Sequence, residues 1–337
     1  MALKVAINGF GRIGRLVFRL IEDNPELEVV AINDLASAGD LAYLLKYDTN
    51  HGTFSTESLS STEDSIIVDG KETKIYSEKN PTDLPWAELG IDLVFECTGL
   101  FNTYDKAMAH ITAGAKKVLL SAPGKGEMKT IVYNVNHQIL DGSEIIVSAA
   151  SCTTNCLAPV VNELNNAFVI KKGYMTTIHA YTNDQTTLDV THKKGINSRR
   201  GRAAAANIIP TSTGAALAIS KVIPELEGKL DGIAVRVPVS TGSMIDLTVE
   251  LSGYVTSTII NDLFISKANE SLSVTSDPIV SSDVIGESHG SVVDLLSTKV
   301  LTVDGKQMVK IIAWYDNEMS YSNQMVRTAL YLGSLMK

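Results

Sequence analysis

A cysteine at the start of a predicted helix is the residue with the clearest capacity for chemistry. Cys152 lies between the apolar run Ile145–Ala150, which is typical of a buried strand, and Cys152–Asn166, whose spacing predicts a helix. Because a helix N-terminus stabilises a thiolate, we expect the pKa of this thiol to lie below its usual value. A lone cysteine is more often a small buried hydrophobe, which is how we interpret Cys97 and Cys156.

A histidine is the natural partner of such a thiol. His179 opens the run His179-Ala180-Tyr181-Thr182-Asn183-Asp184 at the end of a predicted strand, where it could take a proton or, as imidazolium, favour the thiolate. The C-x-x-x-C spacing of Cys152 and Cys156 fits neither a zinc site nor a disulfide, so no metal is predicted. The other histidines are expected to be surface or satisfied core residues: His51, His110, His137, His192 and His289.

A glycine-rich segment near the start of the chain has the pattern of a dinucleotide-binding loop. Gly9-Phe10-Gly11-Arg12-Ile13-Gly14 follows the predicted strand Leu3–Asn8 and opens the predicted helix Arg12–Asp23. The next strand, Leu27–Asn33, is followed by Asp34, which can accept hydrogen bonds from an adenosine ribose. The alternative for Asp34 is a turn residue after a strand. The four features together predict that a pyrophosphate binds at the helix N-terminus.

Alternating strands and helices in the first half predict the frame that carries this loop. Ile91–Cys97 and Val118–Ser121 read as further buried parallel strands, whereas Ser65–Tyr76 carries an Asp69-Gly70 hairpin signal. This alternation predicts an α/β fold with a Rossmann-type doubly wound parallel sheet, in which ligands bind at the carboxyl ends of the strands.

From Cys152 onward the pattern changes to α+β. A long polar segment, Thr182–Arg202, precedes the helix-like Gly214–Val222, and Glu318–Met336 has the spacing of a closing helix. Longer alternating runs predict a catalytic domain with a mainly antiparallel sheet. These runs are Ile233–Pro238, Met244–Gly253, Val292–Leu296 and Met308–Trp314.

Length and composition agree with a two-domain globular protein. The 337 residues exceed the size at which one core usually stops growing, so we expect a dinucleotide-binding domain (1–151 and 318–337) and a catalytic domain (152–317). The net charge of −9 does not favour nucleic acid or anionic membrane. Three cysteines, no signal-peptide pattern and no apolar run of about 18 residues predict a cytoplasmic protein in a reducing compartment.

Seven motifs, spread in order over essentially the whole chain, resemble the phosphorylating glyceraldehyde-3-phosphate dehydrogenase family of the glycolytic, NAD-dependent type. They are INGFGRIGR at Ile7–Arg15, SAASCTTNCLAP at Ser148–Pro159, HAYTNDQ at His179–Gln185, IIPTSTGAA at Ile208–Ala216, GKLDG at Gly228–Gly232, RVP at Arg236–Pro238 and WYDNEMSYSNQ at Trp314–Gln324.

The resemblance implies an activity that agrees with the chemistry of the residues. Cys152 would attack D-glyceraldehyde 3-phosphate to give a thiohemiacetal, NAD would accept a hydride to leave a thioester, and inorganic phosphate would release 1,3-bisphosphoglycerate. His179 would pair with the thiolate and act as the general base. The resemblance also implies a homotetramer, in which the basic loop Lys193–Arg202 lies at the subunit core instead of binding nucleic acid.

The resemblance also assigns residues to the cofactor. Asn317 would hold the nicotinamide carboxamide, although it could also cap the last helix. The implied NAD-binding residues are Gly9, Gly11, Arg12, Ile13, Asp34, Lys79, Ser121 and Asn317. The family often has Leu-Pro before the histidine matching His192, where this chain has Val190-Thr191, so its preference for NAD over NADP could be softer.

Two anion sites are implied, one for the substrate phosphate and one for the attacking phosphate. Arg236 lies in mid-strand between Val235 and Val237, where an unpaired charge is costly, so either a bidentate phosphate contact or a structural ion pair would explain it. Thr182 and Arg200 complete the second site, where the alignment favours Arg200 and leaves Arg199 open. The implied substrate-binding residues are Ser151, Cys152, Thr153, Thr182, Arg200, Thr213, Gly214 and Arg236.

Two other functions remain open from the sequence. A paralogue that oxidises erythrose 4-phosphate would share the fold, the cysteine and the cofactor. A non-enzymatic binding protein on the same fold is the other alternative, and the retained Cys152, His179 and Arg236 make it an additional role at most.

Overall fold

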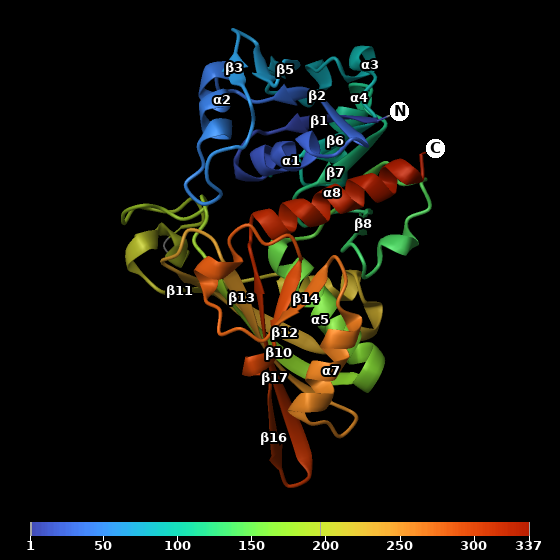
Figure 1. The fold of residues 1–337 in the computed structure, drawn as a ribbon, viewed down its shortest axis with the longest axis vertical. Coiled ribbons are helices and arrows are strands. Elements are labelled where there is room, and N and C mark those ends of the chain that lie inside the picture. Colours follow the sequence, from blue (N-terminus) through green and yellow to red (C-terminus); the bar gives the residue numbers. More distant parts are fainter. Residues whose placement is uncertain (1, 196, 337) are drawn as a thin grey trace. The chain divides into compact units, whose positions relative to one another are not determined.

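The chain divides into two compact units. The computed structural model describes residues 2–195 and 197–336. One unit comprises Met1–Ser151 and Ser322–Lys337, and the other comprises Cys152–Tyr321. Figure 1 labels their helices and strands.

The first unit is built on a nine-stranded sheet that is mostly parallel. The strand order is β3-β4-β5-β2-β1-β6-β7-β9-β8, with antiparallel pairing only along β3-β4-β5. The strands are β1 (Leu3–Asn8), β2 (Leu27–Asn33), β3 (Leu59–Ser61), β4 (Ser65–Val68), β5 (Lys71–Tyr76), β6 (Leu93–Glu96), β7 (Lys117–Leu120), β8 (Lys129–Thr130) and β9 (Ile146–Ser148). The predicted Asp69-Gly70 hairpin is confirmed, and both of its turn residues have positive φ.

Helices connect these strands in the manner expected of a doubly wound fold. They are α1 (Arg12–Glu22), α2 (Ala38–Lys46), α3 (Trp86–Leu89) and α4 (Tyr104–Thr112). The side chains of α1 that pack on the sheet include Leu16, Val17 and Phe18, which are fully buried. Both α2 and α4 begin at hydroxyl caps, Ser37 and Thr103, that accept a backbone N–H from the first turn.

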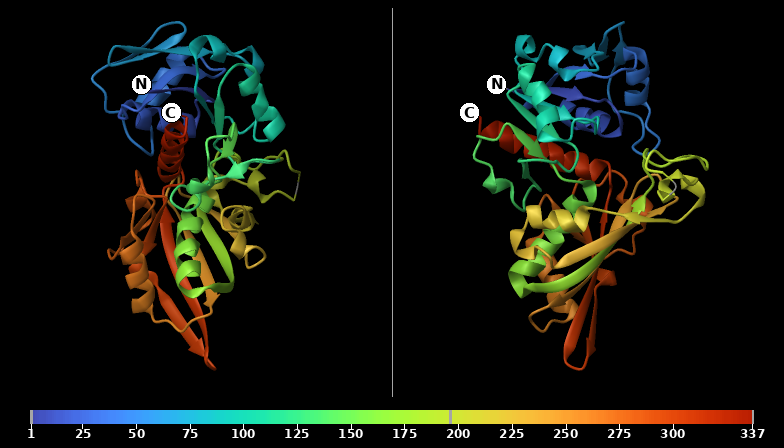
Figure 2. Two further views of the ribbon diagram at one scale, coloured as in Figure 1. Left: turned by 90° about the vertical axis from the view of Figure 1, so that its right-hand side faces the viewer. Right: turned by 180° about the vertical axis from the view of Figure 1, so that it is seen from behind.

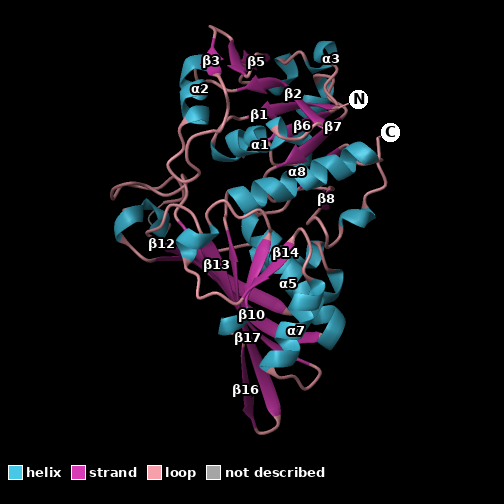
Figure 3. Ribbon diagram, in the orientation of Figure 1, coloured by secondary structure: helices cyan, strands magenta, loops and turns pink. Residues whose placement is uncertain are grey.

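The second unit contains an eight-stranded, mainly antiparallel sheet (Figure 3). The strand order is β11-β12-β10-β13-β17-β15-β14, and β16 pairs with β17. The strands are β10 (Ile170–Ala180), β11 (Ile209–Ser212), β12 (Leu230–Val237), β13 (Ser243–Leu251), β14 (Leu272–Thr275), β15 (Ser291–Asp294), β16 (Lys299–Val303) and β17 (Lys306–Tyr315). Although most pairs are antiparallel, β10 and β12 run parallel, and this pairing puts His179 opposite Arg236.

One long helix covers a face of this second sheet. Helix α5 (Cys152–Phe168) packs on β10, β13, β15 and β17 (Figure 2). It continues through Pro159 and is buried along most of its length. Helix α6 (Ala215–Ala218) packs against α5, α7 (Ser257–Lys267) packs on β14, and α8 (Met319–Ser334) closes the chain.

The predicted fold class is confirmed, since one sheet is mainly parallel and the other mainly antiparallel. The polar segment after Thr182 contains no strand before β11 among its described residues, only short 3-10 helices such as Arg199–Gly201. None of the described helices is both long and apolar enough to cross a membrane.

Candidate active site

The glycine-rich loop between β1 and α1 has the geometry of a phosphate-binding loop. Gly9 has φ of +90°, and a Cβ there would lie 2.8 Å from Thr98. A Cβ on Gly14 would lie 2.2 Å from the carbonyl oxygen of Gly9, so only glycine allows the helix to approach the strand. A Cβ on Gly11 would meet nothing within 4 Å, and no side chain caps α1 there. The start of this helix is therefore a position at which an anion such as a pyrophosphate can bind.

A cavity at the carboxyl ends of β1, β2 and β6 continues from this loop. It has a volume of 570 Å³, and its walls include Gly9, Gly11, Asp34 and Lys79. Asp34 accepts the N–H of Phe10 at Oδ2 (2.8 Å) and that of Ala36 at Oδ1 (3.1 Å), which holds its carboxylate beside the loop. The sequence-based alternative, that Asp34 is a turn residue after a strand, describes only part of its role, because Asp34 also lines the cavity.

A buried polar network beneath the loop was not predicted from the sequence. Asn8 Nδ2 donates to Glu96 Oε2 at 2.5 Å, and Asn33 Nδ2 donates to Asn8 Oδ1 at 2.7 Å. Glu96 also accepts the N–H of Thr98 and lies 3.0 Å from Nε2 of His110, which is fully buried. A polar residue ends each of three parallel strands: Asn8, Asn33 and Glu96. This repeated pattern in the sequence could have indicated the network.

The Arg12 side chain does not lie free for a cofactor. Its guanidinium forms a two-pronged ion pair with Asp48, and Nη2 donates at 3.0 Å to Asp48 Oδ1. The Arg12 and His51 partners hold the pKa of Asp48 well below its usual range, despite burial, which acts the other way. The guanidinium therefore fixes Asp48, and it is the backbone of Arg12 and Ile13 at the start of α1 that lies in the loop. Ser121 directly follows β7, and its N–H donates to Glu96 O.

Cys152 and His179 meet within the second unit. Cys152 is the first residue of α5 and His179 the next-to-last residue of β10, and Sγ lies 3.4 Å from Nε2. His179 Nδ1 lies 2.7 Å from the carbonyl oxygen of Ala180. The Ala180 carbonyl only accepts, so it favours the tautomer with the proton on Nδ1 and the lone pair of Nε2 toward the sulfur, whereas Arg236 Nη1, a donor 2.9 Å from Nδ1, opposes this tautomer.

Burial acts against the expected thiolate–imidazolium pair, since His179 is buried and Cys152 is half-buried. Burial raises the pKa of the Cys152 thiol and outweighs the Arg236 charge and the backbone N–H of Thr153, which lower it. Burial and the Arg236 charge lower the pKa of His179 to about 3. A neutral thiol therefore faces a neutral imidazole, and the sequence-based expectation of a thiol pKa below its usual value is overturned.

Arg236 makes no direct ion pair with a carboxylate among the described residues. Its Nη1 donates to Ala180 O at 2.8 Å and to Thr182 Oγ1 at 3.2 Å, and lies 2.9 Å from His179 Nδ1. Its Nε is buried without a partner in the part of the chain that is described. A guanidinium with neutral hydrogen-bond partners and an orphaned Nε is suited to an incoming anion, which argues against the structural ion pair.

Asp184, which the sequence analysis did not single out, connects two predicted phosphate ligands. It accepts the Thr182 hydroxyl at 2.6 Å and forms an ion pair with Arg200. Arg200 Nε also donates to Thr211 Oγ1 at 3.1 Å. The charge of Arg200 contributes to lowering the pKa values of His179 and Arg236, which places Arg200 electrostatically within the same site. Arg199 lines a neighbouring surface cavity of 570 Å³ together with Arg200.

The other predicted anion ligands lie at two helix starts. Thr153 is 5% exposed in the first turn of α5, directly after Cys152, and Ser151 precedes them. Thr213 and Gly214 precede the four-residue α6, and Thr213 Oγ1 accepts the N–H of Ala215 at 3.2 Å.

Asn317 is held by hydroxyl groups and does not cap the last helix. Its Oδ1 accepts Ser243 Oγ at 2.8 Å and lies 3.4 Å from Thr241 Oγ1. The neighbouring Asp316, fully buried, accepts the N–H groups of Glu318 and Met319 at the start of α8 and the Thr241 hydroxyl. The alternative that Asn317 caps α8 is therefore wrong, and Asp316 does so.

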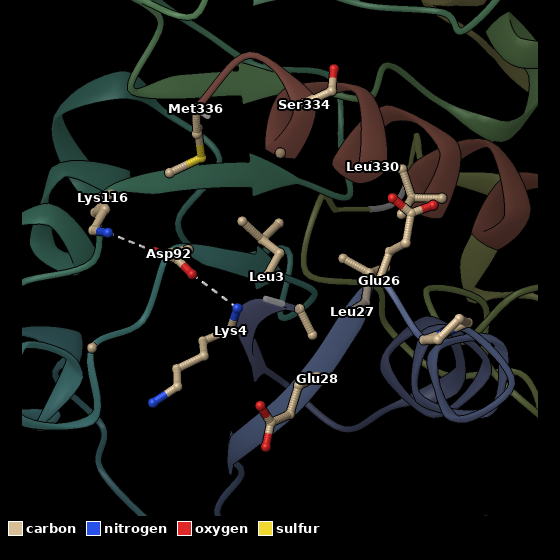
Figure 4. A pocket seen from close by; sticks show the side chains of 14 residues that line it. Leu3, Lys4, Glu26, Leu27, Glu28, Asp92, Lys116, Leu330, Ser334 and Met336 are labelled. Carbon is tan, nitrogen blue, oxygen red and sulfur yellow. Dashed lines mark hydrogen bonds and ion pairs between the residues drawn. The ribbon is translucent and has the colours of Figure 1, made fainter.

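A second cavity of the first unit shares no lining residue with the cavity beside the glycine-rich loop. It has a volume of 910 Å³ and lies at the amino ends of β1, β2 and β6, where Asp92 pairs with Lys116 and accepts the N–H of Lys4 (Figure 4). Within residues 2–195 and 197–336, no cluster of three His, Cys, Asp or Glu side chains could hold a metal ion.

Comparison with known proteins agrees with this arrangement. A family profile described as "Glyceraldehyde 3-phosphate dehydrogenase, NAD binding domain" matches residues 3–104, and the C-terminal domain of the same family matches residues 151–317. Proteins named glyceraldehyde-3-phosphate dehydrogenase from Clostridium pasteurianum and Clostridium acetobutylicum are 58% and 57% identical over 334 residues, which is 99% of each chain. The protein of that name from Streptococcus pyogenes is 52% identical over 338 residues, covering 100% of both chains. The chain belongs to the glyceraldehyde-3-phosphate dehydrogenase family.

Proposed function

We propose that the chain oxidises D-glyceraldehyde 3-phosphate to 1,3-bisphosphoglycerate with NAD and inorganic phosphate, as the NAD-dependent enzyme of glycolysis. The observation that carries this proposal is the Cys152–His179 pair at 3.4 Å, with Arg236 on the neighbouring strand. The full-length relatives at 52–58% identity bear the name of this enzyme.

The histidine acts first as a general base. The Nε2 lone pair of His179 accepts the proton of Cys152 as the sulfur attacks the aldehyde carbon. The resulting imidazolium then stabilises and protonates the oxyanion of the thiohemiacetal, and takes this proton back as the thioester forms. The Ala180 carbonyl accepts the Nδ1 proton in both the neutral and the charged ring.

The cofactor residues have the donor set that a dinucleotide needs. NAD, when bound, supplies the hydride acceptor that converts the thiohemiacetal into a thioester. The uncapped start of α1 with Gly9, Gly11, Arg12 and Ile13 would hold the pyrophosphate through backbone N–H groups. The residues we assign to the rest of the cofactor are Asp34 and Lys79 on the adenosine side, and Ser121 and Asn317 on the nicotinamide side.

Two groups of residues would hold the phosphates. Arg236 and Thr182, with the catalytic Cys152 beside them, suit the phosphate of the substrate, because the guanidinium has neutral hydrogen-bond partners. The second group would receive the phosphate that cleaves the thioester. Its members are Ser151, Thr153, Arg200, Thr213 and Gly214. We keep Arg200 over Arg199 because its charge reaches His179 and Arg236.

We assign a separate role to each unit and propose that several copies of the chain assemble. We assign the dinucleotide-binding role to residues 1–151 and 318–337 and the catalytic role to residues 152–317, which the two family matches support. A homotetramer in the cytoplasm remains our proposal. Leu188 and Val190 in the polar segment are 72% and 59% exposed, as expected of side chains that a second subunit covers.

A comparison of aldehydes tests the function. The rate of NADH formation with glyceraldehyde 3-phosphate and phosphate should exceed the rate with erythrose 4-phosphate by at least tenfold in kcat/KM. The reverse ratio would establish the erythrose 4-phosphate paralogue instead. No turnover of either aldehyde, with NAD binding retained, would leave only the non-enzymatic binding role. Cys152→Ser is the matched control for background oxidation.

A further inference from the structure

A buried phenol lies behind the Cys152 site, and the established chemistry of the site does not use it. Tyr315, the last residue of β17, is fully buried. Its hydroxyl lies 2.9 Å from Thr153 Oγ1 on α5 and 2.9 Å from Thr177 Oγ1 on β10. Thr177 in turn donates to the carbonyl oxygen of Met244 at 3.2 Å. The three hydroxyls therefore form one chain that ends at a carbonyl.

The direction of donation along this chain follows from its end. A carbonyl oxygen has no proton, so the single proton of Thr177 goes to Met244. Thr177 must then accept the proton of Tyr315, and Tyr315 must accept that of Thr153. The Thr153 hydroxyl consequently directs its proton away from its neighbour Cys152, although a hydrogen bond from this hydroxyl would lower the pKa of the thiol.

We propose that Tyr315 is a positioning residue that fixes the direction in which the Thr153 hydroxyl donates. With its proton on Thr177, Tyr315 takes up the Thr153 proton, and Thr153 presents an oxygen lone pair to the Cys152 sulfur. When negative charge develops on the sulfur, the Tyr315 proton turns to Thr153, and Thr153 donates to the charge. No proton changes its oxygen in this reversal, and no hydrogen bond is lost overall.

This arrangement stabilises the neutral thiol at rest, and it allows the Thr153 hydroxyl to donate to the sulfur once the sulfur becomes charged. Other groups around the sulfur are His179 on β10, Arg236 on β12 and Cys156 one turn further along α5. Among them Arg236 is the cation that favours the thiolate, while Cys156 and Tyr315 are neutral groups whose pKa values burial raises. The hydroxyl chain can be changed without altering any of these charges, which allows a clean test.

The test is the pH profile of Cys152 alkylation by iodoacetamide in the full chain, without added cofactor or phosphate. Thr177→Val removes the acceptor of the Tyr315 proton, so that this proton turns to Thr153 and the Thr153 proton to the sulfur. We expect alkylation at pH 7 to accelerate by about two- to tenfold, the factor that the net contribution of one typical hydrogen bond gives. Tyr315→Phe also releases the Thr153 proton and should accelerate alkylation, but by a smaller factor because the polarising phenol is gone.

Two further variants separate this mechanism from a loosened core. In a Thr153→Val background, neither Thr177→Val nor Tyr315→Phe should change the alkylation rate, because the donor to the sulfur is missing. Thr298→Val is the matched control, since this buried threonine has a hydroxyl with no partner among the described residues. It should leave the profile unchanged.

Two results would refute the role of Tyr315, and both are independent of whether the proposed enzymatic function is correct. Unchanged or slower alkylation in Thr177→Val would overturn it, as would an equal acceleration when Thr153 is replaced by valine. That the three hydroxyls assist catalysis rests on the proposed function. Alkylation does not, so an inactive enzyme with the expected alkylation pattern would refute the function and retain the hydroxyl chain.

Discussion

Replacing the carboxylate of Asp34 should change which dinucleotide the chain prefers. Both oxygens of Asp34 accept backbone N–H groups, that of Phe10 at 2.8 Å and that of Ala36 at 3.1 Å, so the charge has a fixed position in the cavity. A ribose bound there would bring a 2′-phosphate of NADP next to this carboxylate. Asp34→Asn is the informative change, because an amide oxygen can still accept the Phe10 N–H while the charge is removed.

The size of the effect follows from Coulomb's law. At about 4 Å and an effective dielectric of about 20, one pair of like charges costs on the order of 4 kcal/mol, and a 2′-phosphate brings nearly two charges. Asp34 is partly exposed and neighbours Leu35, which is 60% exposed, so water screens the interaction. A reduction to about 2–3 kcal/mol corresponds to a preference for NAD of about 30- to 150-fold.

The assay is kcat/KM with NAD and with NADP at matched ionic strength. The wild-type ratio should lie in this range, and Asp34→Asn should reduce it at least tenfold, mainly by improving NADP. Glu78→Gln is the matched control, because Glu78 lines the same cavity and its N–H, not its carboxylate, contacts the network through Asn33. It should change the ratio less. A wild-type ratio within threefold of unity, or equal effects of the two variants, would refute the electrostatic reasoning.

Four other changes test the second unit and the junction before it. One equivalent of iodoacetamide per subunit should abolish activity, and Cys152→Ser should lose at least about three orders of magnitude in kcat; peptide mapping that found another cysteine modified would contradict the assignment. Arg236→Leu should reduce the discrimination between glyceraldehyde 3-phosphate and glyceraldehyde by about ten- to a hundredfold in kcat/KM, and an unchanged ratio would make Arg236 structural. His179 has a folded-state pKa of about 3 against an ordinary 6.5, so the folded chain binds fewer protons between these pH values and its stability falls as the pH is lowered through them. The slope should be up to about 1.4 kcal/mol per pH unit and should flatten in His179→Gln, as measured by urea midpoints; parallel curves would refute it. Ala150 has φ of +57°, so Ala150→Val should reduce the free energy of unfolding by about 1–3 kcal/mol while Ala150→Gly should not, and equal effects would show that the backbone is not strained there.

The elements with a clear hydrophobic pattern were predictable from the sequence. Leu3–Asn8 and Leu27–Asn33 have the predicted bounds, because buried parallel strands are short apolar runs that end at polar residues. Cys152 and His179 were placed correctly at a helix start and a strand end, since these positions depend on local patterns alone. The parallel pairing of β10 with β12 was not predictable, because it joins residues more than fifty positions apart.

The parts that failed depend on burial and on distant partners. The pKa of Cys152 was expected to be low from its helix position, but the surrounding strands bury the sulfur, and this dominates. Asp48 binds the Arg12 side chain from outside the glycine-rich motif, so no motif could indicate it. Tyr315 reads as an ordinary aromatic residue at a strand end until β10 and α5 bring two threonine hydroxyls to its phenol.

The position of β17 in the sheet has a consequence for synthesis of the chain. Residues 306–315 are the last strand to leave the ribosome, yet β17 lies between β13 and β15 in the interior of the sheet. Until it is inserted, the nascent chain exposes the unpaired edges of these two strands, which are sites where unfinished chains aggregate. The same strand brings Tyr315 to Thr153, so a growing polypeptide carries Cys152 for more than 150 residues without its final surroundings. The reactive thiol therefore acquires its enzymatic environment only at the end of translation, and a holdase that shields the β13 edge would guard the aggregation-prone strand and the immature nucleophile together.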